Sequence, residues 1–427
     1  MNYAQALEYL YGLRQFGLKQ GLAGVQKLAE LAGNPQNSLR FIHVAGTNGK
    51  GSTCAFLESI CRSAGLRTGL YTSPHLVSFT ERLQLNRTAI AESEVVSQTG
   101  RLQRLMAQME PEQPPTFFEV VTVMALQYFA ESGCDIVLWE TGMGGRLDAT
   151  NIVTPLASVI TSIGFDHQQW LGNTLARIAA EKAGIIKPTV PVFTATTSPE
   201  VLEVIREKAG SLGSQLFELP DHGEAGLLGD TKPSLAGSHQ LRNAALAVLV
   251  ARHLQATLGL SAQHIQHGLQ NTVWHGRLQK IAWHGKSVWL DGAHNEEGAE
   301  ALIQALPGLT ESREKPWLVF GALEDKAWLK IWTLLAPHFQ GTLLVPVQSD
   351  RAVVLQKMLE ECKRAQPNAR LESRESLAEL LSNPPDATSM VITGSLYLVG
   401  EALEILGGLS ATTAPFERGQ SDWRPGN

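Results

Sequence analysis

The sequence predicts an α/β protein with two parallel sheets in succession: a P-loop domain followed by a smaller, Rossmann-like α/β domain. Two observations carry this prediction. Short apolar runs alternate with helical patterns over most of the chain, as in parallel sheets that are covered by helices. In addition, a glycine-rich segment at 46–53 lies directly between an apolar run and a helical pattern, which is the arrangement of a phosphate-binding loop.

The composition is that of an ordinary globular protein. The chain has 427 residues, of which 44% are hydrophobic and 18% are charged, and this length favours two or three domains. No apolar run reaches the roughly 18 residues of a membrane span, and the N-terminus lacks the features of a secretory signal. The net charge of −6 argues against a nucleic-acid binder. We therefore expect a cytoplasmic protein without nucleic-acid or membrane partners, whose four scattered cysteines are reduced core residues.

Two series of buried-strand candidates define the predicted domains. The first series is 41–45, 68–72, 135–139, 156–161 and 190–194, and the second is 288–290, 317–320, 342–347 and 390–393. A helical stretch at 241–258 and a segment of mixed polarity at 273–286 separate the two series. We therefore expect an N-terminal domain at 1–280, a C-terminal domain at 281–412 and a flexible tail without periodicity at 413–427.

The strongest local signal is the glycine-rich loop itself, which consists of Gly46, Thr47, Asn48, Gly49, Lys50, Gly51 and Ser52. Glycines let backbone N–H groups turn toward a polyphosphate, the following helix adds its dipole, and Lys50 supplies a positive charge. Ser52 or Thr53 offers a hydroxyl to Mg²⁺. The spacing departs from G-x-x-x-x-G-K-[ST], because Val44 takes the first glycine position and Gly51 follows the lysine. A glycine-rich surface turn is the alternative, which the strand–loop–helix order disfavours.

Polar residues follow four of the predicted strands. They are Ser73, Glu140, His167, Asp291 and His294. Singly, each is more often a capping or turn residue. Ligands of open parallel sheets bind beyond the carboxyl ends of the strands, so several such residues together with a phosphate loop predict one shared site.

Glu140 is the leading carboxylate for a Mg²⁺ ion, because it follows the most apolar predicted strand. Mg²⁺ prefers oxygen ligands and keeps several waters, so one carboxylate with hydroxyls and phosphates suffices. His167 is a candidate for a further ligand. The alternative for His167, of about equal weight on its own, is a hydrogen-bonded turn histidine after Asp166.

Lys182 is predicted on the apolar face of a helix. It shares helical spacing with Leu175, Ile178 and Ala179, whereas Arg177 lies off this stripe. One explanation is that the lysine snorkels to solvent from the end of the helix. The other is that its amine meets an anion or is chemically modified.

Ten motifs occur in order along the chain. They are GTNGKGS (46–52), TSPHL (72–76), TFFE (116–119), ETGMGGRLDATN (140–151), GFDHQQWLG (164–172), EKAGI (181–185), HQLRNA (239–244), HGRLQ (275–279), DGAHN (291–295) and TGSLYLVGE (393–401). With this set, the chain resembles the folylpolyglutamate synthase/dihydrofolate synthase family, which is related to the Mur ligases. The combination is highly specific, although few of the motifs are specific alone.

The resemblance implies a P-loop ATPase domain and a set of site residues. ATP would be bound by Gly46–Ser52 together with Asn243, Arg277 and Asp291, and His294 also matches a nucleotide-binding position of the family. Mg²⁺, at two sites, would be bound by Ser52, Ser73, Glu140, His167 and Lys182. In this family the lysine carries a carbamate, which would explain a lysine on an inward face. The resemblance also allows for a bound monovalent cation and implies that the protein is a monomer. At position 275 this chain has histidine, where members of the family more usually have proline.

The resemblance further implies an ATP-dependent ligase with dihydropteroate or a reduced folate, L-glutamate and ATP as substrates. The acid would be bound by Thr116, Phe118, Asp148 and Ala149. Its carboxylate would take the γ-phosphate to give an acyl phosphate, which the amine of glutamate then attacks. Lys50, Lys182 and His294 would be catalytic, with His294 as the base for the incoming amine.

Other functions remain open from the sequence. One is folylpolyglutamate synthesis alone or Mur-type ligation of another acid, because residue types do not reveal the details of a pocket. Another is a nucleotide-dependent switch that uses only the phosphate loop, although this leaves DGAHN, Glu140 and His167 unexplained. A dinucleotide oxidoreductase is disfavoured, because the glycines at 142–145 do not form G-x-G-x-x-G.

Overall fold

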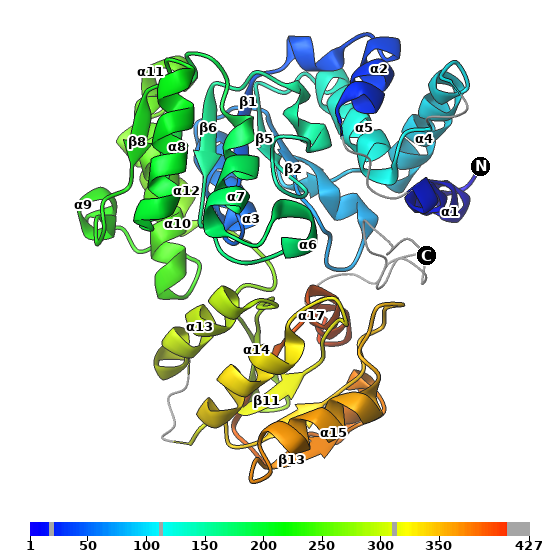
Figure 1. Cartoon of the computed structure of the whole chain (residues 1–427), viewed down its shortest axis with the longest axis vertical. Helices are drawn as coiled ribbons and strands as arrows, with labels where there is room; N and C mark the ends of the chain where they lie inside the picture. The colour runs from blue at the N-terminus through cyan, green and yellow to red at the C-terminus, as the bar shows by residue number, and fades with distance from the viewer. Residues whose placement is uncertain (17–20, 111–113, 310–313, 408–427) are drawn as a thin grey trace.

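The computed structural model describes residues 1–16, 21–110, 114–309 and 314–407. Two mainly parallel sheets follow one another along the chain, and helices cover both (Figure 1). The predicted α/β fold class is therefore confirmed. The predicted tail at 413–427 lies outside the described residues.

The first sheet has the strand order β4-β3-β2-β5-β1-β6-β7-β8. Its strands are β1 (Phe41–Ala45), β2 (Thr68–Tyr71), β3 (Leu83–Leu85), β4 (Thr88–Ala89), β5 (Ile136–Glu140), β6 (Ala157–Ile160), β7 (Val192–Thr194) and β8 (Leu216–Glu218). The strands from β2 to β8 in this order are parallel, whereas β3 and β4 add an antiparallel edge. Because β1 lies between β5 and β6, the glycine-rich loop emerges from the middle of the sheet.

Helices cover both faces of the first sheet. They are α1 (Tyr3–Gly12), α2 (Ala23–Leu31), α3 (Lys50–Ser63), α4 (Glu92–Met106), α5 (Phe117–Glu131), α6 (Gln168–Leu171), α7 (Leu175–Lys182), α8 (Pro199–Ser211), α9 (Glu224–Leu228), α10 (Ser238–His253), α11 (Gln255–Leu258) and α12 (Ala262–Gln270). One face packs on α1, α2, α4 and α5, and the other packs on α3, α10 and α12. Strands β1 and β5 are fully buried, because both of their faces lie in a core, and they are apolar except for His43 in β1 and Glu140 at the end of β5.

Helix α5 shows how local sequence fixes an element beside the cavity. The hydroxyl of Thr116 accepts a hydrogen bond from the backbone N–H of Glu119 (3.3 Å), and the Glu119 carboxylate accepts one from the N–H of Thr116 (2.7 Å). This reciprocal capping box sets the start of the helix. As a result, Phe118 in the first turn is held at the cavity wall.

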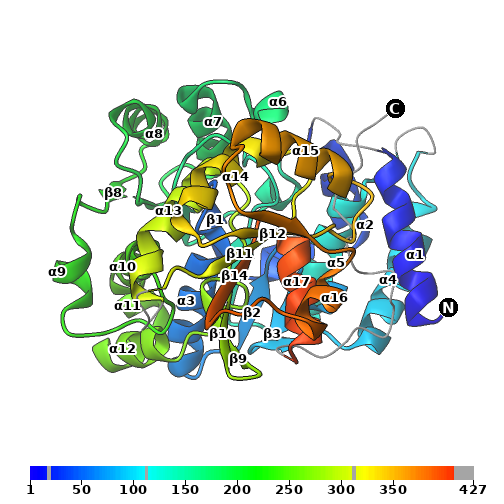
Figure 2. The ribbon, with the colours of Figure 1, turned by 90° about the horizontal axis from the view of Figure 1, so that it is seen from below.

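The second sheet has the order β13-β12-β11-β14-β10-β9. Its strands are β9 (Gln279–Trp283), β10 (Lys286–Leu290), β11 (Trp317–Phe320), β12 (Thr342–Leu344), β13 (Leu371–Ser373) and β14 (Ser389–Thr393). Its helices are α13 (Glu296–Ala305), α14 (Trp328–Leu335), α15 (Leu355–Ala365), α16 (Leu377–Ser382) and α17 (Leu396–Ile405). One face packs on α16 and α17 and the other on α13, α14 and α15, as Figure 2 shows from below.

The strands that the sequence did not predict are short or lie at sheet edges. Strand β9 falls inside the segment of mixed polarity at 273–286 and pairs antiparallel with β10, so its side chains are only partly buried. Strands β3, β4, β8 and β13 span two or three residues each. Because β9 begins at Gln279, it crosses the boundary that the sequence predicts between residues 280 and 281.

None of the helices in the described part of the chain combines the length and the apolar character that a membrane span requires.

Candidate active site between the two sheets

One cavity of about 730 Å³ lies between the two sheets, where the loops after β1, β2, β5, β6 and β10 meet. The residues that the sequence predicts for the site all line this cavity. They are Gly46, Thr47, Asn48, Gly49, Lys50, Gly51, Ser52, Ser73, Thr116, Phe118, Glu140, Asp148, Ala149, His167, Lys182, Asn243, Arg277, Asp291 and His294. The structure thus brings together residues that lie up to about 250 positions apart in the sequence, as expected for strand ends at one edge.

The glycine-rich loop is shaped by close neighbours. Gly49 has a left-handed backbone (φ 84°) and is the N-cap of α3, whose first residue is Lys50. A Cβ at Gly49 would overlap the Asn243 side chain, so only glycine fits. The ammonium of Lys50 donates to the carbonyl of Thr47 at 3.2 Å, which folds the lysine back over the loop. The backbone N–H groups at the start of α3 and this charge form a ready anion site.

Two residues that sequence reasoning missed hold the loop in place. The amide of Gln240 donates to the hydroxyl of Ser52 (3.2 Å) and accepts from Asn243 (3.1 Å), so it joins two predicted ATP-binding residues. The ring of Trp274 lies 2.8 Å from where a Cβ of Gly51 would be. This contact explains the glycine after the lysine, because any larger residue at 51 would displace the indole ring.

Glu140 ends β5 inside the cavity and is almost fully buried (4% exposed). Its carboxylate accepts a hydrogen bond from the backbone N–H of Ser73 at 3.2 Å. Burial raises the pKa of Glu140 to about 7, although Lys50 and the Ser73 N–H act in the opposite direction. The carboxylate therefore lacks enough positive charge nearby, which is the condition in which a cation binds well.

Lys182 lies on the buried face of α7, as its helical spacing predicts (4% exposed). Its amine donates to the carbonyl of Gly46 at 2.6 Å, at the beginning of the glycine-rich loop. Burial, followed by the charge of Lys50, lowers the pKa of Lys182 to about 7. The snorkelling alternative is therefore wrong: the amine lies inside the cavity, and about half of it is neutral near pH 7.

A cluster around Asp166 joins the two halves of the cavity. Lys326, which follows β11 in the second sheet's half of the chain, donates to Asp166 at 2.6 Å. The imidazoles of His167 and His294 each lie 3.8 Å from the other oxygen of the same carboxylate. Although burial acts in the opposite direction, Lys326 and the two imidazoles hold the pKa of Asp166 below its usual value. Lys326 could not be predicted as a site residue, because its partner lies 160 residues away in the sequence.

His167 shows features of both interpretations. Its backbone is left-handed (φ 51°), and its N–H donates to Asp166 at 2.8 Å, as in a turn. Partial burial, followed by the charge of Lys326, lowers the pKa of His167, so its ring is neutral at pH 7. The side chain is 41% exposed and lines the cavity, so a neutral ring nitrogen is available to a ligand there.

The glycine-rich loop also contacts the second half of the chain directly. The amide of Asn48 donates to Asn295 (3.1 Å) and to Glu297 (2.8 Å), and Asn295 donates back to Asn48 (3.0 Å). Asn295 is the N-cap of α13, so a helix terminus from the second half lies at the phosphate loop. A ligand at this loop would therefore contact both halves.

A further part of the cavity combines an aromatic ring with a carboxylate. The ring of Phe118 lies 2.5 Å from where a Cβ of Gly142 would be, so the glycine lets the ring approach the loop after β5. Asp148 lies in this loop, is almost fully buried, and accepts hydrogen bonds from the N–H groups of Met143 (2.8 Å) and Thr150 (3.0 Å). Such a pocket suits a flat ring with N–H donors.

Among the described residues, no three His, Cys, Asp or Glu side chains are grouped to hold a metal. The predicted metal ligands include only two side chains of these types, the carboxylate of Glu140 and the imidazole of His167. The others are the hydroxyls of Ser52 and Ser73 and the amine of Lys182, so the predicted set does not form such a group.

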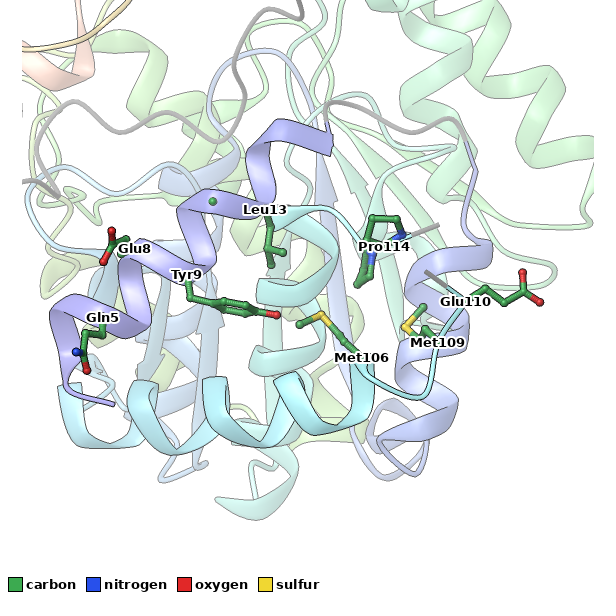
Figure 3. Close-up of a pocket in the computed structure, with 10 residues that line it drawn as sticks. Gln5, Glu8, Tyr9, Leu13, Met106, Met109, Glu110 and Pro114 are labelled. Carbon is green, nitrogen blue, oxygen red and sulfur yellow. The ribbon is translucent and has the colours of Figure 1, made fainter. Parts of the chain in front are cut away.

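A second cavity, of about 560 Å³, lies between α1 and α4, where Tyr9 and Met106 face one another (Figure 3). It is lined by Gln5, Glu8, Tyr9, Gly12, Leu13, Met106, Met109, Glu110, Pro114 and Pro115. None of the predicted site residues belongs to it.

Two family models match most of the chain. The Mur ligase middle domain matches residues 44–251, and the Mur ligase glutamate ligase domain matches residues 276–396. The dihydrofolate synthase/folylpolyglutamate synthase of Bacillus subtilis is 36% identical over 93% of this chain and 98% of that protein. The folylpolyglutamate synthase of Lacticaseibacillus casei is 33% identical over 96% of this chain and 100% of that protein.

Solved structures agree with these matches. The folylpolyglutamate synthase of Thermotoga maritima superposes with a TM-score of 0.83 at 33% identity, covering 96% of this chain and 98% of that one. E. coli FolC in complex with DHPP and ADP superposes with a TM-score of 0.83 at 29% identity, with the same coverage. Because the matches extend over both sheets and the cavity between them, the chain belongs to the dihydrofolate synthase/folylpolyglutamate synthase family of the Mur ligases, which are ATP-dependent amide ligases.

Proposed function

We propose that this chain joins L-glutamate to dihydropteroate and to the glutamyl tail of reduced folates. One observation carries the proposal: a single cavity is lined by a phosphate loop, by Glu140 and Lys182, and by the ring of Phe118 beside Asp148. ATP and an acid with a flat ring would therefore lie next to each other. The relative from B. subtilis, which carries the names of both activities, supports the bifunctional assignment.

In this proposal, the phosphates of ATP lie on the loop from Gly46 to Ser52. The backbone N–H groups at the start of α3 would bind the phosphate oxygens, and Lys50 would neutralise charge on the transferred group. Arg277 lines the same cavity, within electrostatic reach of Glu140 and Asp291. Asn243 would contact the nucleotide, and the ADP complex of E. coli FolC supports ATP as the substrate.

Glu140 fits a Mg²⁺ ion. It is a buried carboxylate with a raised pKa beside a phosphate loop, and the hydroxyls of Ser52 and Ser73 line the same cavity. Together with His167 they would hold Mg²⁺, with phosphate oxygens and water completing the set. When bound, Mg²⁺ neutralises the charge that develops on the transferred phosphoryl group.

Lys182 fits a carbamate. The neutral amine attacks CO₂: a C–N bond forms, one C=O π bond opens to leave a negatively charged oxygen, and the amine releases one proton to solvent. The resulting carbamate keeps one N–H. The remaining N–H retains a donor for the carbonyl of Gly46, which lies 2.6 Å from the amine nitrogen. The lowered pKa of Lys182, about 7, supports this reaction, because only the unprotonated amine is a nucleophile. The carbamate oxygens would serve as further metal ligands.

The reaction would proceed in two steps, phosphoryl transfer and then amide formation. In the first, the carboxylate of the acid attacks the γ-phosphate, the bond to ADP breaks, and an acyl phosphate forms while Lys50 balances the charge. In the second, the amine of glutamate attacks the acyl carbon and phosphate leaves. Phe118, Asp148 and Ala149 would hold the ring of the acid, with Thr116 at the end of the pocket, so that its carboxylate faces the phosphates.

His294 would accept the proton of the incoming amine. Its Nδ1 donates to the carbonyl of Gly292 at 2.7 Å, which leaves Nε2 as the free acceptor. Burial, followed by the charge of Lys326, lowers the pKa of His294 to about 4, so the ring is neutral but weakly basic. Asp166, whose carboxylate lies 3.8 Å from Nε2, would stabilise the protonated ring.

We expect His294→Ala to lower the rate of amide formation by about 10²-fold, the lower end of the range for general base catalysis. The Kd of ATP should change by less than about threefold, because the role of the imidazole is in the second step. Rapid-quench measurement of acyl phosphate and amide, with ATP binding by calorimetry, checks both. Equal losses in binding and in amide formation would contradict the base assignment.

The proposed function is tested by phosphate release with ATP, glutamate and one of two acceptors, dihydropteroate or a reduced folate. We expect both acceptors to support glutamate-dependent release. Release with the reduced folate alone would assign folylpolyglutamate synthesis only. If neither acceptor supports release, a Mur-type ligase for another acid is favoured, and ATP turnover without glutamate would favour a nucleotide-dependent switch.

A further inference from the structure

A buried chain of hydrogen bonds connects the strand of the phosphate loop with Asp148. Nε2 of His43, in the middle of β1, lies 2.9 Å from the hydroxyl of Thr150. That hydroxyl donates in turn to a carboxylate oxygen of Asp148. His43 and Thr150 are both fully buried, and neither lines the cavity.

The direction of the chain follows from its two ends. Asp148 accepts from Thr150 through both the N–H and the hydroxyl, and from the N–H groups of Met143 and Gly142. Because the hydroxyl proton points to Asp148, the hydroxyl oxygen must accept from His43, so Nε2 of the imidazole carries the hydrogen. Nδ1 of His43 is buried without a hydrogen-bond partner among the described residues.

An unpartnered buried nitrogen is costly, and an apolar side chain would avoid the cost. The presence of a histidine at this position is therefore explained by the hydrogen bond that its other nitrogen, Nε2, makes. Burial, followed by the charge of Lys187, lowers the pKa of His43 to about 3, so the ring is neutral and only Nε2–H is left to act.

Thr150 is also held from the neighbouring strand. Trp139, the register partner of His43 in β5, donates its indole N–H to the carbonyl of Thr150 at 2.9 Å. The same strand ends one residue later with Glu140. Side chains from β1 and β5 thus hold the loop segment that carries Asp148 against the strands that end at the phosphate loop and at Glu140.

We propose that His43 and Thr150 are positioning residues that hold Asp148 as an ionised hydrogen-bond acceptor at a fixed distance from the phosphate loop. The inference rests on the proposed function, because it requires that Asp148 binds the ring of the acid. It goes further by naming what maintains the orientation and charge of the carboxylate to which the ring would present its N–H donors. An acid whose ring offers an acceptor at this point would be rejected.

The test compares two pairs of variants. Thr150→Val and His43→Leu remove the chain, whereas Thr150→Ser keeps the hydroxyl and His43→Gln keeps an N–H donor near the position of Nε2. In the first pair we expect the Kd and KM for dihydropteroate to rise by at least about tenfold, as for a lost charge-assisted hydrogen bond. The Kd for ATP and the value of kcat at saturation should stay within about threefold of wild type, and the second pair should resemble wild type.

A pH profile distinguishes positioning from general support of the fold. Burial raises the pKa of Asp148, and the hydrogen bond from the Thr150 hydroxyl acts in the opposite direction. Without that hydroxyl the carboxylate takes up a proton at higher pH still. The affinity of Thr150→Val for dihydropteroate should therefore fall at a higher pH than that of wild type. An unchanged affinity and pH profile, or equal losses for ATP and dihydropteroate, would overturn the inference. Failure of the proposed function looks different, because the wild-type protein itself would then not bind dihydropteroate.

Discussion

Replacement of Lys182 by alanine is expected to lower kcat by about 10³-fold, the size of effect seen when one preorganised charge-stabilising group is lost. The structure gives the reason: the amine is almost fully buried at the start of the phosphate loop, and its lowered pKa of about 7 allows it to react with CO₂. Without the carbamate, the cavity loses a negative charge that would help to hold Mg²⁺.

Added short carboxylic acids should restore part of the activity of Lys182→Ala, because acetate or propionate can place a carboxylate in the space that the side chain leaves. The matched control is Lys208→Ala, which removes an exposed lysine of α8 and should not change activity with or without the acids. Carbon-13 NMR of the wild type in labelled bicarbonate should show a carbamate signal that the variant lacks. A fully active alanine variant, or wild-type protein without that signal, would refute the carbamate.

The regular part of the fold was accessible from the sequence because its signals are local. Strand β11 is apolar along its whole length, β1 and β5 each contain a single polar residue, and the glycine-rich loop follows β1 directly. The inward face of α7 could be predicted from helical spacing alone. By contrast, β9 is partly exposed and contains no continuous apolar run. Its antiparallel pairing with β10 therefore leaves no clear signal in the sequence.

The site was predictable where it consists of residues at strand ends and not where it consists of contacts between distant segments. Gln240 reaches Ser52 across 188 residues, and Lys326 reaches Asp166 across 160. Nothing in the spacing of either residue marks such a partner. The first contact depends on how α10 packs on α3, and the second depends on how the two halves of the chain are placed. From the sequence, His43 is only one residue of a predicted strand, because its hydrogen bond to Thr150 forms only when β1 and the loop after β5 pack together.

Glu140→Gln should have an effect of about the same size as Lys182→Ala, with a characteristic dependence on pH and Mg²⁺. The amide has the shape of the carboxylate but no charge, so kcat should fall by about 10²- to 10³-fold at any Mg²⁺ concentration. In the wild type, a proton and Mg²⁺ compete for a carboxylate with a pKa of about 7. The Mg²⁺ concentration for half-maximal activity should therefore rise as the pH falls below 7, by up to about tenfold per pH unit, and the variant should lack this dependence.

The same substitution should stabilise the protein in the absence of ligands. Burial raises the pKa of Glu140 to about 7, from an ordinary value of 4.5 in the unfolded chain. Between these two pH values the folded protein binds the proton of Glu140 more tightly than the unfolded chain does. The contribution of protonated Glu140 to stability is therefore fully present at pH 4.5 and below, and it is lost as the pH rises through 7. Glu140→Gln cannot ionise, so at pH 8 it should unfold with a free energy up to about 3 kcal/mol higher than wild type.

Chemical denaturation at pH 5 and pH 8 checks this gain, with the exposed Glu131→Gln as the matched control. The two measurements together separate a functional from a structural carboxylate. If Glu140 served the fold, its replacement would lower both activity and stability. A carboxylate that is retained in spite of its cost to the folded state needs a partner that arrives later, and a cation bound with the phosphates of ATP supplies that partner. A loss of stability at pH 8 in Glu140→Gln would therefore remove the main physical support for the metal site.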